Sequence, residues 1–144
     1  MQISDETEIG ASAEVVWAIA TDADRLHEWV PGFEQSKRSD GGGPFAVGST
    51  ARIKQTGLPV AEWLVQDVDD GRRFVWRTTV RGMTLVATHT VSPSSAPGRV
   101  VNRLDLDARG PVLTVLGPLL KGRLAKQLVA ENAALKARAE AGTG

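Results

Sequence analysis

The sequence predicts one α+β domain in which a curved antiparallel sheet of about seven strands wraps around a long C-terminal helix. The 144 residues, 42% hydrophobic and 24% charged, are typical of a single globular domain with its own core. Between residues 33 and 107 the hydrophobic pattern has the period of two that is expected of strands. From about residue 112 to 139 apolar residues instead recur every three or four positions, as on one face of a helix.

The first thirty residues predict a strand and two short helices. Residues 2–9 suit a short strand. Ser12 is a typical N-cap, and Glu14 in the first turn complements the dipole of the helix that follows. Asp22 predicts a second cap and a second short helix, which the turn at 31–32 ends.

Six strands are predicted after this helical unit, in an order that favours a meander. They are expected near 33–39, 48–56, 60–68, 72–80, 83–91 and 99–107. Short turn sequences rich in Gly, Pro, Asp and Ser separate them, and no insertion is long enough for a helix. Consecutive strands should therefore be antiparallel neighbours.

The last predicted element is the long helix, whose apolar face should lie on the concave side of the sheet. Pro118 inside this segment predicts a kink, or a helix that starts one turn late. Every position on the expected face is apolar except one. The positions are Leu113, Leu116, Leu120, Leu124, Leu128, Glu131 and Leu135.

Composition excludes several classes of function. Lys and Arg total 17, as do Asp and Glu, so the basic surplus typical of nucleic-acid binders is missing. Without cysteine there are no disulfides or thiolate sites, and two histidines without matching carboxylates predict no metal site. No glycine-rich loop has phosphate-binding context, so we expect no cofactor. A polar start and the lack of any run of ~20 apolar residues predict a cytoplasmic protein without a membrane span.

Alternation also predicts which side chains face the interior of the sheet. The inward set is Ala51, Ile53 and Gln55, then Phe74, Trp76, Thr78 and Val80, then Met83, Leu85, Ala87, His89 and Val91, and finally Val100, Asn102, Leu104 and Leu106. For residues 60–68 neither parity is favoured. No acidic residue falls clearly on this face of the sheet.

Three residues of the inward set are polar: Gln55, His89 and Asn102. An unpaired buried amide or imidazole costs roughly 1–3 kcal/mol, so each needs a partner, a water or a ligand. His89 and Asn102 lie on consecutive predicted strands. They could form a hydrogen bond in the core, or they could anchor a ligand oxygen, and His89 could transfer protons.

Several segments resemble the polyketide cyclase/dehydrase family of the START/Bet v 1-like (SRPBCC) superfamily. They are Ala13-Glu14-Val15-Val16-Trp17-Ala18-Ile19, the stretch from Asp24 to the Trp29-Val30-Pro31-Gly32 turn, the hairpin segments 62–65 and 72–77, and the closing helix from Pro118 to Leu135. The resemblance covers nearly the whole chain in the expected order. It implies a helix-grip fold with an elongated cavity between sheet and helix.

Three functions remain open on these grounds. The first is binding of a small hydrophobic or aromatic molecule, polyketide- or lipid-like, in the cavity. The second is a polyketide cyclase/dehydratase-type enzyme that uses the same cavity, with His89 as the candidate catalytic residue. The third is a protein-interaction module with a closed cavity. The residues expected to bind the ligand are Gln55, Trp76, Thr78, Leu85, His89, Asn102, Leu120 and Leu124.

Overall fold

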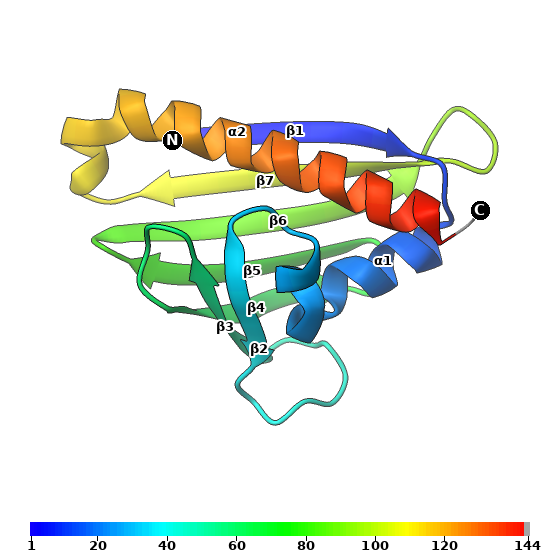
Figure 1. Ribbon diagram of the computed structural model, residues 1–144, viewed down its shortest axis with the longest axis horizontal. Coiled ribbons are helices and arrows are strands. Elements are labelled where there is room, and N and C mark those ends of the chain that lie inside the picture. The colour runs from blue at the N-terminus through cyan, green and yellow to red at the C-terminus, as the bar shows by residue number, and fades with distance from the viewer. Residues whose placement is uncertain (143–144) are drawn as a thin grey trace.

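A curled seven-stranded antiparallel sheet holds one long helix across its inner side (Figure 1). The computed structural model describes residues 1–142. The elements in chain order are β1 (Gln2–Ile9), α1 (Ala13–Thr21), the 3₁₀ helix η1 (Ala23–Glu28), β2 (Phe33–Arg38), β3 (Thr50–Gln55), β4 (Ala61–Asp69), β5 (Arg73–Val80), β6 (Met83–Pro93), β7 (Val100–Arg109) and α2 (Val112–Ala141). This confirms the predicted fold class and order.

The sheet is a meander from β2 to β7, with every consecutive pair antiparallel. Its strand order is β1-β7-β6-β5-β4-β3-β2, so the N-terminal strand completes the sheet beside β7. Each strand from β2 to β7 pairs with its neighbour in sequence, as predicted, although the connection between β2 and β3 is a longer loop over residues 39–49.

The two N-terminal helices agree only partly with expectation. The Ser12 Oγ accepts a hydrogen bond from the backbone N–H of Val15 at 3.2 Å, which confirms the predicted cap of α1. Asp22 occupies the N-cap position of η1 as predicted, but its side chain makes no capping hydrogen bond. Asp22 also ends α1, and its carboxylate instead lies 3.6 Å from the Arg25 guanidinium.

Helix α2 continues through Pro118 but is bent near its N-terminal end, as Figure 1 shows. Its C-terminal half is packed on the sheet, where Leu128 and Leu135 are buried. The first turns are less deeply packed. Leu113 and Leu120 are partly buried against the core, but Leu116, which was expected to face the core with them, is 43% exposed.

Strand β4 has no single inward parity, because a bulge interrupts it. The register with β5 shifts between Val65 and Asp67. Before the bulge the odd positions Trp63 and Val65 face inward, and after it the even position Val68 does. A bulge adds one residue to one strand and so changes which positions face the core.

The predicted inward faces of β5, β6 and β7 are confirmed. Every residue of those three sets is buried except Ala87, which is half-buried. The charged side chains of these three strands are all at outward positions. Among the described residues no helix is both long and apolar enough to cross a bilayer.

Candidate functional site

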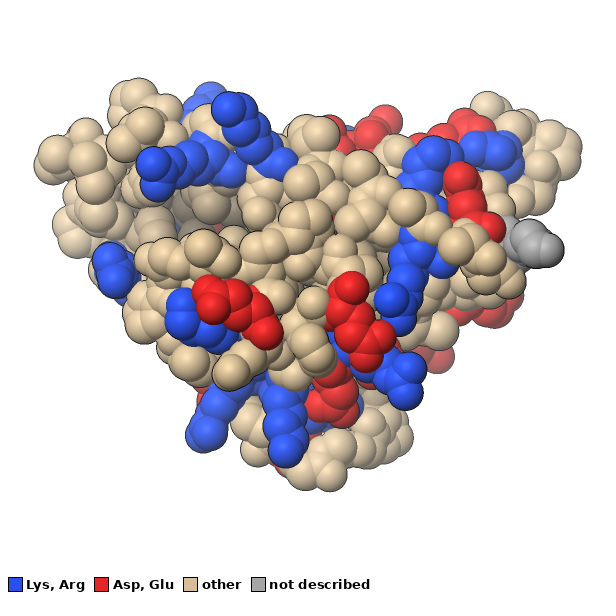
Figure 2. Space-filling model, viewed as in Figure 1, with Lys and Arg blue, Asp and Glu red and all other residues tan. Residues whose placement is uncertain are grey.

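A cavity lies between the concave side of the sheet and the middle of α2. Its volume is about 90 Å³, and it opens to solvent at its mouth. Figure 2 shows the surface hollowed beside the N-terminal half of α2, with basic side chains above the hollow. Strands β2 to β7, η1 and α2 all contribute to the lining.

Aromatic rings form much of the wall. The five that line it are Trp29, Phe33, Trp63, Phe74 and Trp76. The ring centroids of Trp63 and Trp76 are 5.2 Å apart, and Phe74 meets Trp76 edge to face at 5.7 Å. Such contacts hold the rings in fixed positions and leave an apolar surface with π faces towards the cavity.

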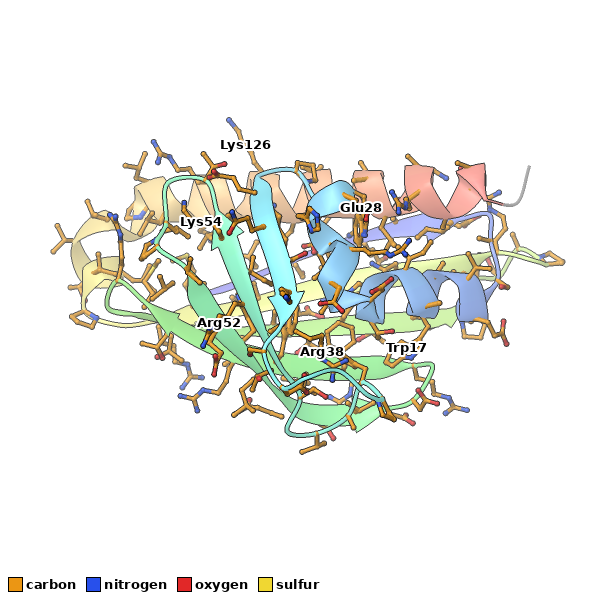
Figure 3. The ribbon with its side chains drawn as sticks, turned by 60° about the horizontal axis from the view of Figure 1, so that its bottom comes forward. Trp17, Glu28, Arg38, Arg52, Lys54 and Lys126 are labelled. Atoms are coloured by element: carbon orange, nitrogen blue, oxygen red, sulfur yellow. The ribbon has the colours of Figure 1, made fainter. Side chains whose placement is uncertain are left out.

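Trp17 supports this wall from outside the cavity. It comes from α1 (Figure 3), and its ring packs edge to face on Phe74 at 5.6 Å. Trp17 is not part of the lining, so it stabilises the wall from behind, whereas Ala20 of the same helix and Leu26 of η1 do line the cavity.

His89 lies on the lining with its ring stacked on Phe74 at 5.1 Å. The residue is only 6% exposed, and its Nε2 has no hydrogen-bond partner within residues 1–142. Burial lowers the pKa of His89 to about 4, although the nearby Asn102 side chain opposes the shift. The imidazole is therefore neutral at neutral pH.

Glu131 of α2 also lines the cavity and has no polar partner. In the described part of the chain its carboxylate takes part in no hydrogen bond or ion pair. Protein surrounds it, and the resulting loss of hydration raises the pKa of Glu131 to about 7. The side chain stays half-buried because it borders empty space.

Glu131 is the functional candidate that the sequence analysis did not select. No acidic residue was expected on the inner face of the sheet, and this carboxylate reaches the cavity from the helix. The sequence does contain a feature that could have identified it, because Glu131 is the one polar position on the predicted apolar face of that helix.

Asn102 was expected to bind the ligand, but the structure places it away from the cavity lining. Its Nδ2 donates to Oδ1 of Asn132 at 2.6 Å. Asn132 in turn donates to the backbone carbonyl and the carboxylate of Asp5, at 3.0 and 2.8 Å. The helix thus pairs the Nδ2 of Asn102, whereas its buried Oδ1 has no hydrogen-bond partner among the described residues.

The other expected ligand-binding residues divide into two groups. Those that line the cavity are Gln55, Trp76, Leu85 and Leu124. Thr78 does not, because it donates to the carbonyl of Glu62 at 2.7 Å beside a smaller hollow under the β3–β4 turn. Leu120 does not either, since it packs against the core at the far end of the sheet.

No group of three or more His, Asp or Glu side chains within residues 1–142 is arranged to hold a metal ion. The polar groups on the lining are few and separate. Among the described residues the arrangement offers an aromatic chamber in which Nε2 of His89 and the carboxylate of Glu131 have no hydrogen-bond partner.

Comparison with known proteins gives a match over almost the whole chain. The family model described as polyketide cyclase / dehydrase and lipid transport matches residues 1–140. No curated protein sequence matches significantly.

Solved structures share the fold. A START superfamily protein from Mycobacterium smegmatis superposes with a TM-score of 0.79 at 22% identity, over 96% of this chain and 97% of its own. A point mutant of norcoclaurine synthase from Thalictrum flavum, in complex with a transition-state analogue, superposes with a TM-score of 0.74 at 20% identity, covering 100% of this chain and 96% of its own. A hypothetical protein from Helicobacter pylori superposes with a TM-score of 0.82 at 15% identity, covering 96% of this chain and 88% of its own. At these identities the likeness extends to the fold alone.

Proposed function

Because the chain belongs to the polyketide cyclase / dehydrase and lipid transport family, of the START/Bet v 1-like superfamily, we propose that it binds a small hydrophobic or aromatic molecule, polyketide- or lipid-like, between the sheet and α2. The observation that carries this proposal is the aromatic cavity itself. It is open to solvent, walled by five aromatic rings and provided with few polar groups. Ligand pockets generally have this character.

The wall explains how such a molecule would be held. Each Å² of apolar surface removed from water contributes about 25 cal/mol, and an aromatic ligand would cover both its own surface and that of the rings. Trp63 and Trp76 are already fixed by their mutual contact, so little side-chain entropy would be lost on binding.

The chain contains its own reporters for a binding test. Trp29, Trp63 and Trp76 line the cavity, whereas Trp17 lies behind Phe74. In a ¹H–¹⁵N NMR titration with naphthylmethanol, the indole signals of the three lining tryptophans should shift more than that of Trp17. Native mass spectrometry of the purified protein should reveal any molecule that copurifies.

A cavity-filling variant makes the test specific. Ala87 lies on the lining, so Ala87→Phe should weaken naphthylmethanol binding by about tenfold or more through steric exclusion. Thr90→Phe, which adds a ring on the outward side of the same strand, is the matched control. If the wild-type protein shows no shifts, or if Ala87→Phe binds as well as Thr90→Phe, the cavity is not the binding site.

A second candidate function is proton-transfer catalysis of the cyclase/dehydratase type. The observation that favours it is that His89 and Glu131 share the cavity without protein partners, with the pKa of Glu131 raised to about 7. A general acid or base is most effective when its pKa is near the working pH. An open cavity does not support the third alternative, an interaction module with a closed cavity.

Proton exchange separates catalysis from simple binding. If the site transfers protons, the wild-type protein should speed deuterium uptake in D₂O at the carbon next to the carbonyl group of tetralone, as measured by NMR. Glu131→Gln should remove the acceleration but keep tetralone binding. Equal exchange rates with and without wild-type protein would contradict the catalytic function, and only the binding function would remain.

A further inference from the structure

The lining of the cavity carries acidic but no basic side chains. Among the described residues that line it there is no lysine or arginine, and the acids are Asp105 and Glu131. The Asp105 carboxylate is already neutralised, because the Arg103 guanidinium lies 3.1 Å away. Glu131 therefore provides the one carboxylate that is free to meet a ligand.

This arrangement distinguishes between ligand charges. An anionic ligand would enter a chamber that has no counter-ion for it and would face Glu131 at close range, where the low dielectric makes repulsion strong. A cation would find a carboxylate and several aromatic faces. Both attract positive charge, the first by direct pairing and the second through the ring quadrupole.

On this basis we propose that the ligand is a hydrophobic amine, in which a protonated nitrogen pairs with Glu131 while its apolar or ring portion lies against Trp63 and Trp76. This inference rests on the proposed function, since it names the chemical class that the same cavity takes. It also accounts for a carboxylate without a partner, which is costly in a protein interior unless something binds to it.

The basic side chains near the hollow in Figure 2 do not oppose this assignment. Figure 3 shows Lys126 pointing outward from α2, where it is exposed. Lys54 of β3 is half-buried, and its Nζ is engaged by the Glu34 carboxylate at 3.4 Å and by the backbone carbonyl of Gln55 at 3.0 Å. Exposed charges are screened by salt over about 8 Å, whereas the interaction with Glu131 takes place inside the protein.

Three probes with the same ring system test the charge preference. They are naphthylmethylamine, naphthylmethanol and naphthoate, which are cationic, neutral and anionic near pH 8. Dissociation constants from NMR titration or calorimetry should rank the amine tightest and naphthoate weakest. We expect the amine to bind at least about tenfold more tightly than the alcohol, the range of a hydrogen bond to a charged group.

The substitution Glu131→Gln preserves size and removes the charge. It should bring amine binding to within about twofold of naphthylmethanol binding when both are measured on the variant. Glu14→Gln removes the same charge from the exposed first turn of α1 and should leave the preference intact. Circular dichroism and a melting curve show that each variant is folded.

The possible failures are distinguishable. If none of the three probes binds to the wild-type protein, the proposed function itself fails. If naphthylmethanol binds but the amine is no tighter, or naphthoate is the tightest, the cavity binds apolar ligands and the assignment to amines is overturned. An amine preference that persists in Glu131→Gln would also overturn it, because Glu131 would not be its source.

Discussion

Nδ2 of Asn102 donates to Oδ1 of Asn132 across 2.6 Å, and this hydrogen bond ties β7 to α2 in the interior of the protein. Neither residue is exposed to solvent. Asn132 extends the connection to Asp5 on β1, so one helical side chain holds two neighbouring strands. The C-terminal half of α2 is thereby fixed to the sheet, while the part nearer its N-terminus borders the cavity.

Removing one member of this pair should be costly. Asn132→Leu leaves the Asn102 amide and the Asp5 carboxylate without their partner, and we expect a loss of about 2–4 kcal/mol in the free energy of unfolding. Urea denaturation measures the change. The double variant Asn102→Leu/Asn132→Leu should recover part of it, since two apolar groups can replace a hydrogen-bonded pair at little cost. A double variant less stable than the sum of the single ones would contradict this account.

The sequence predicts this fold well because its signals are local. Alternation located every strand within about two residues, and the Ser12 cap placed α1. The inward parity of β4 could not be predicted, since the bulge at Gln66 changes the phase of the pattern in mid-strand. A bulge is a property of the pairing between two strands, and neither strand's hydrophobic pattern reveals it alone.

The site residues on the sheet could be predicted from the sequence, but those that α2 contributes could not. His89 and Trp76 were placed on the inner face by alternation. The partners Glu131 and Asn132 come from a helix more than twenty residues later, and their meeting with the sheet depends on how α2 is rotated. Periodicity does place Asn132 between Leu128 and Leu135 on the buried face, which is the signal that could have identified it.

Glu131→Gln should change how stability depends on pH. Burial raises the pKa of Glu131 in the folded protein from 4.5 to about 7. Between those values the folded state holds a proton that the unfolded state has released, so this group makes stability fall as the pH rises. The variant should be roughly 1–3 kcal/mol more stable than wild type near pH 8 and show no such loss, as measured by urea unfolding across pH. Equal stability near pH 8 would contradict the raised pKa.

His89→Leu should reveal the opposite dependence. Burial lowers the pKa of His89 from 6.5 to about 4, so between these values only the unfolded state is protonated and stability rises with pH. Over much of the range from about pH 4.5 to 6.5 the effects of His89 and Glu131 oppose each other, and the wild-type profile should be nearly flat. His89→Leu should then show a clear fall in stability as the pH rises through this range. The exposed His27→Gln is the control, and an unchanged profile in His89→Leu would disprove the compensation.

Gly110→Ala should destabilise the junction between β7 and α2. At φ +134° this glycine has no room for a side chain, because an added Cβ would lie 2.0 Å from the Gly82 carbonyl oxygen. We expect a loss above about 2 kcal/mol in the free energy of unfolding. Gly42→Ala measures the backbone strain of a positive φ without a steric clash, since Gly42 also has a positive φ but no atom lies within 4 Å of an added Cβ. It should cost about 1 kcal/mol, and equal effects at the two sites would show that the contact with Gly82 is unimportant.

Binding of a hydrophobic amine should depend on pH through Glu131. Naphthylmethylamine is cationic throughout the range from about pH 8 to pH 6, so only the protein's ionisation changes. The other titratable groups on the lining are His89, with a pKa of about 4, and Asp105, which is paired with Arg103.

Since the pKa of Glu131 in the free protein is about 7, amine binding near pH 6 must first remove its proton. We expect the affinity to fall about tenfold from pH 8 to pH 6, one factor of ten for each pH unit below the pKa. Calorimetric titration at the two pH values measures this change. Naphthylmethanol binding to wild type and amine binding to Glu131→Gln should each stay constant within about twofold. An amine affinity that is unchanged in wild type, or that falls equally in the variant, would show that the carboxylate of Glu131 does not bind the nitrogen.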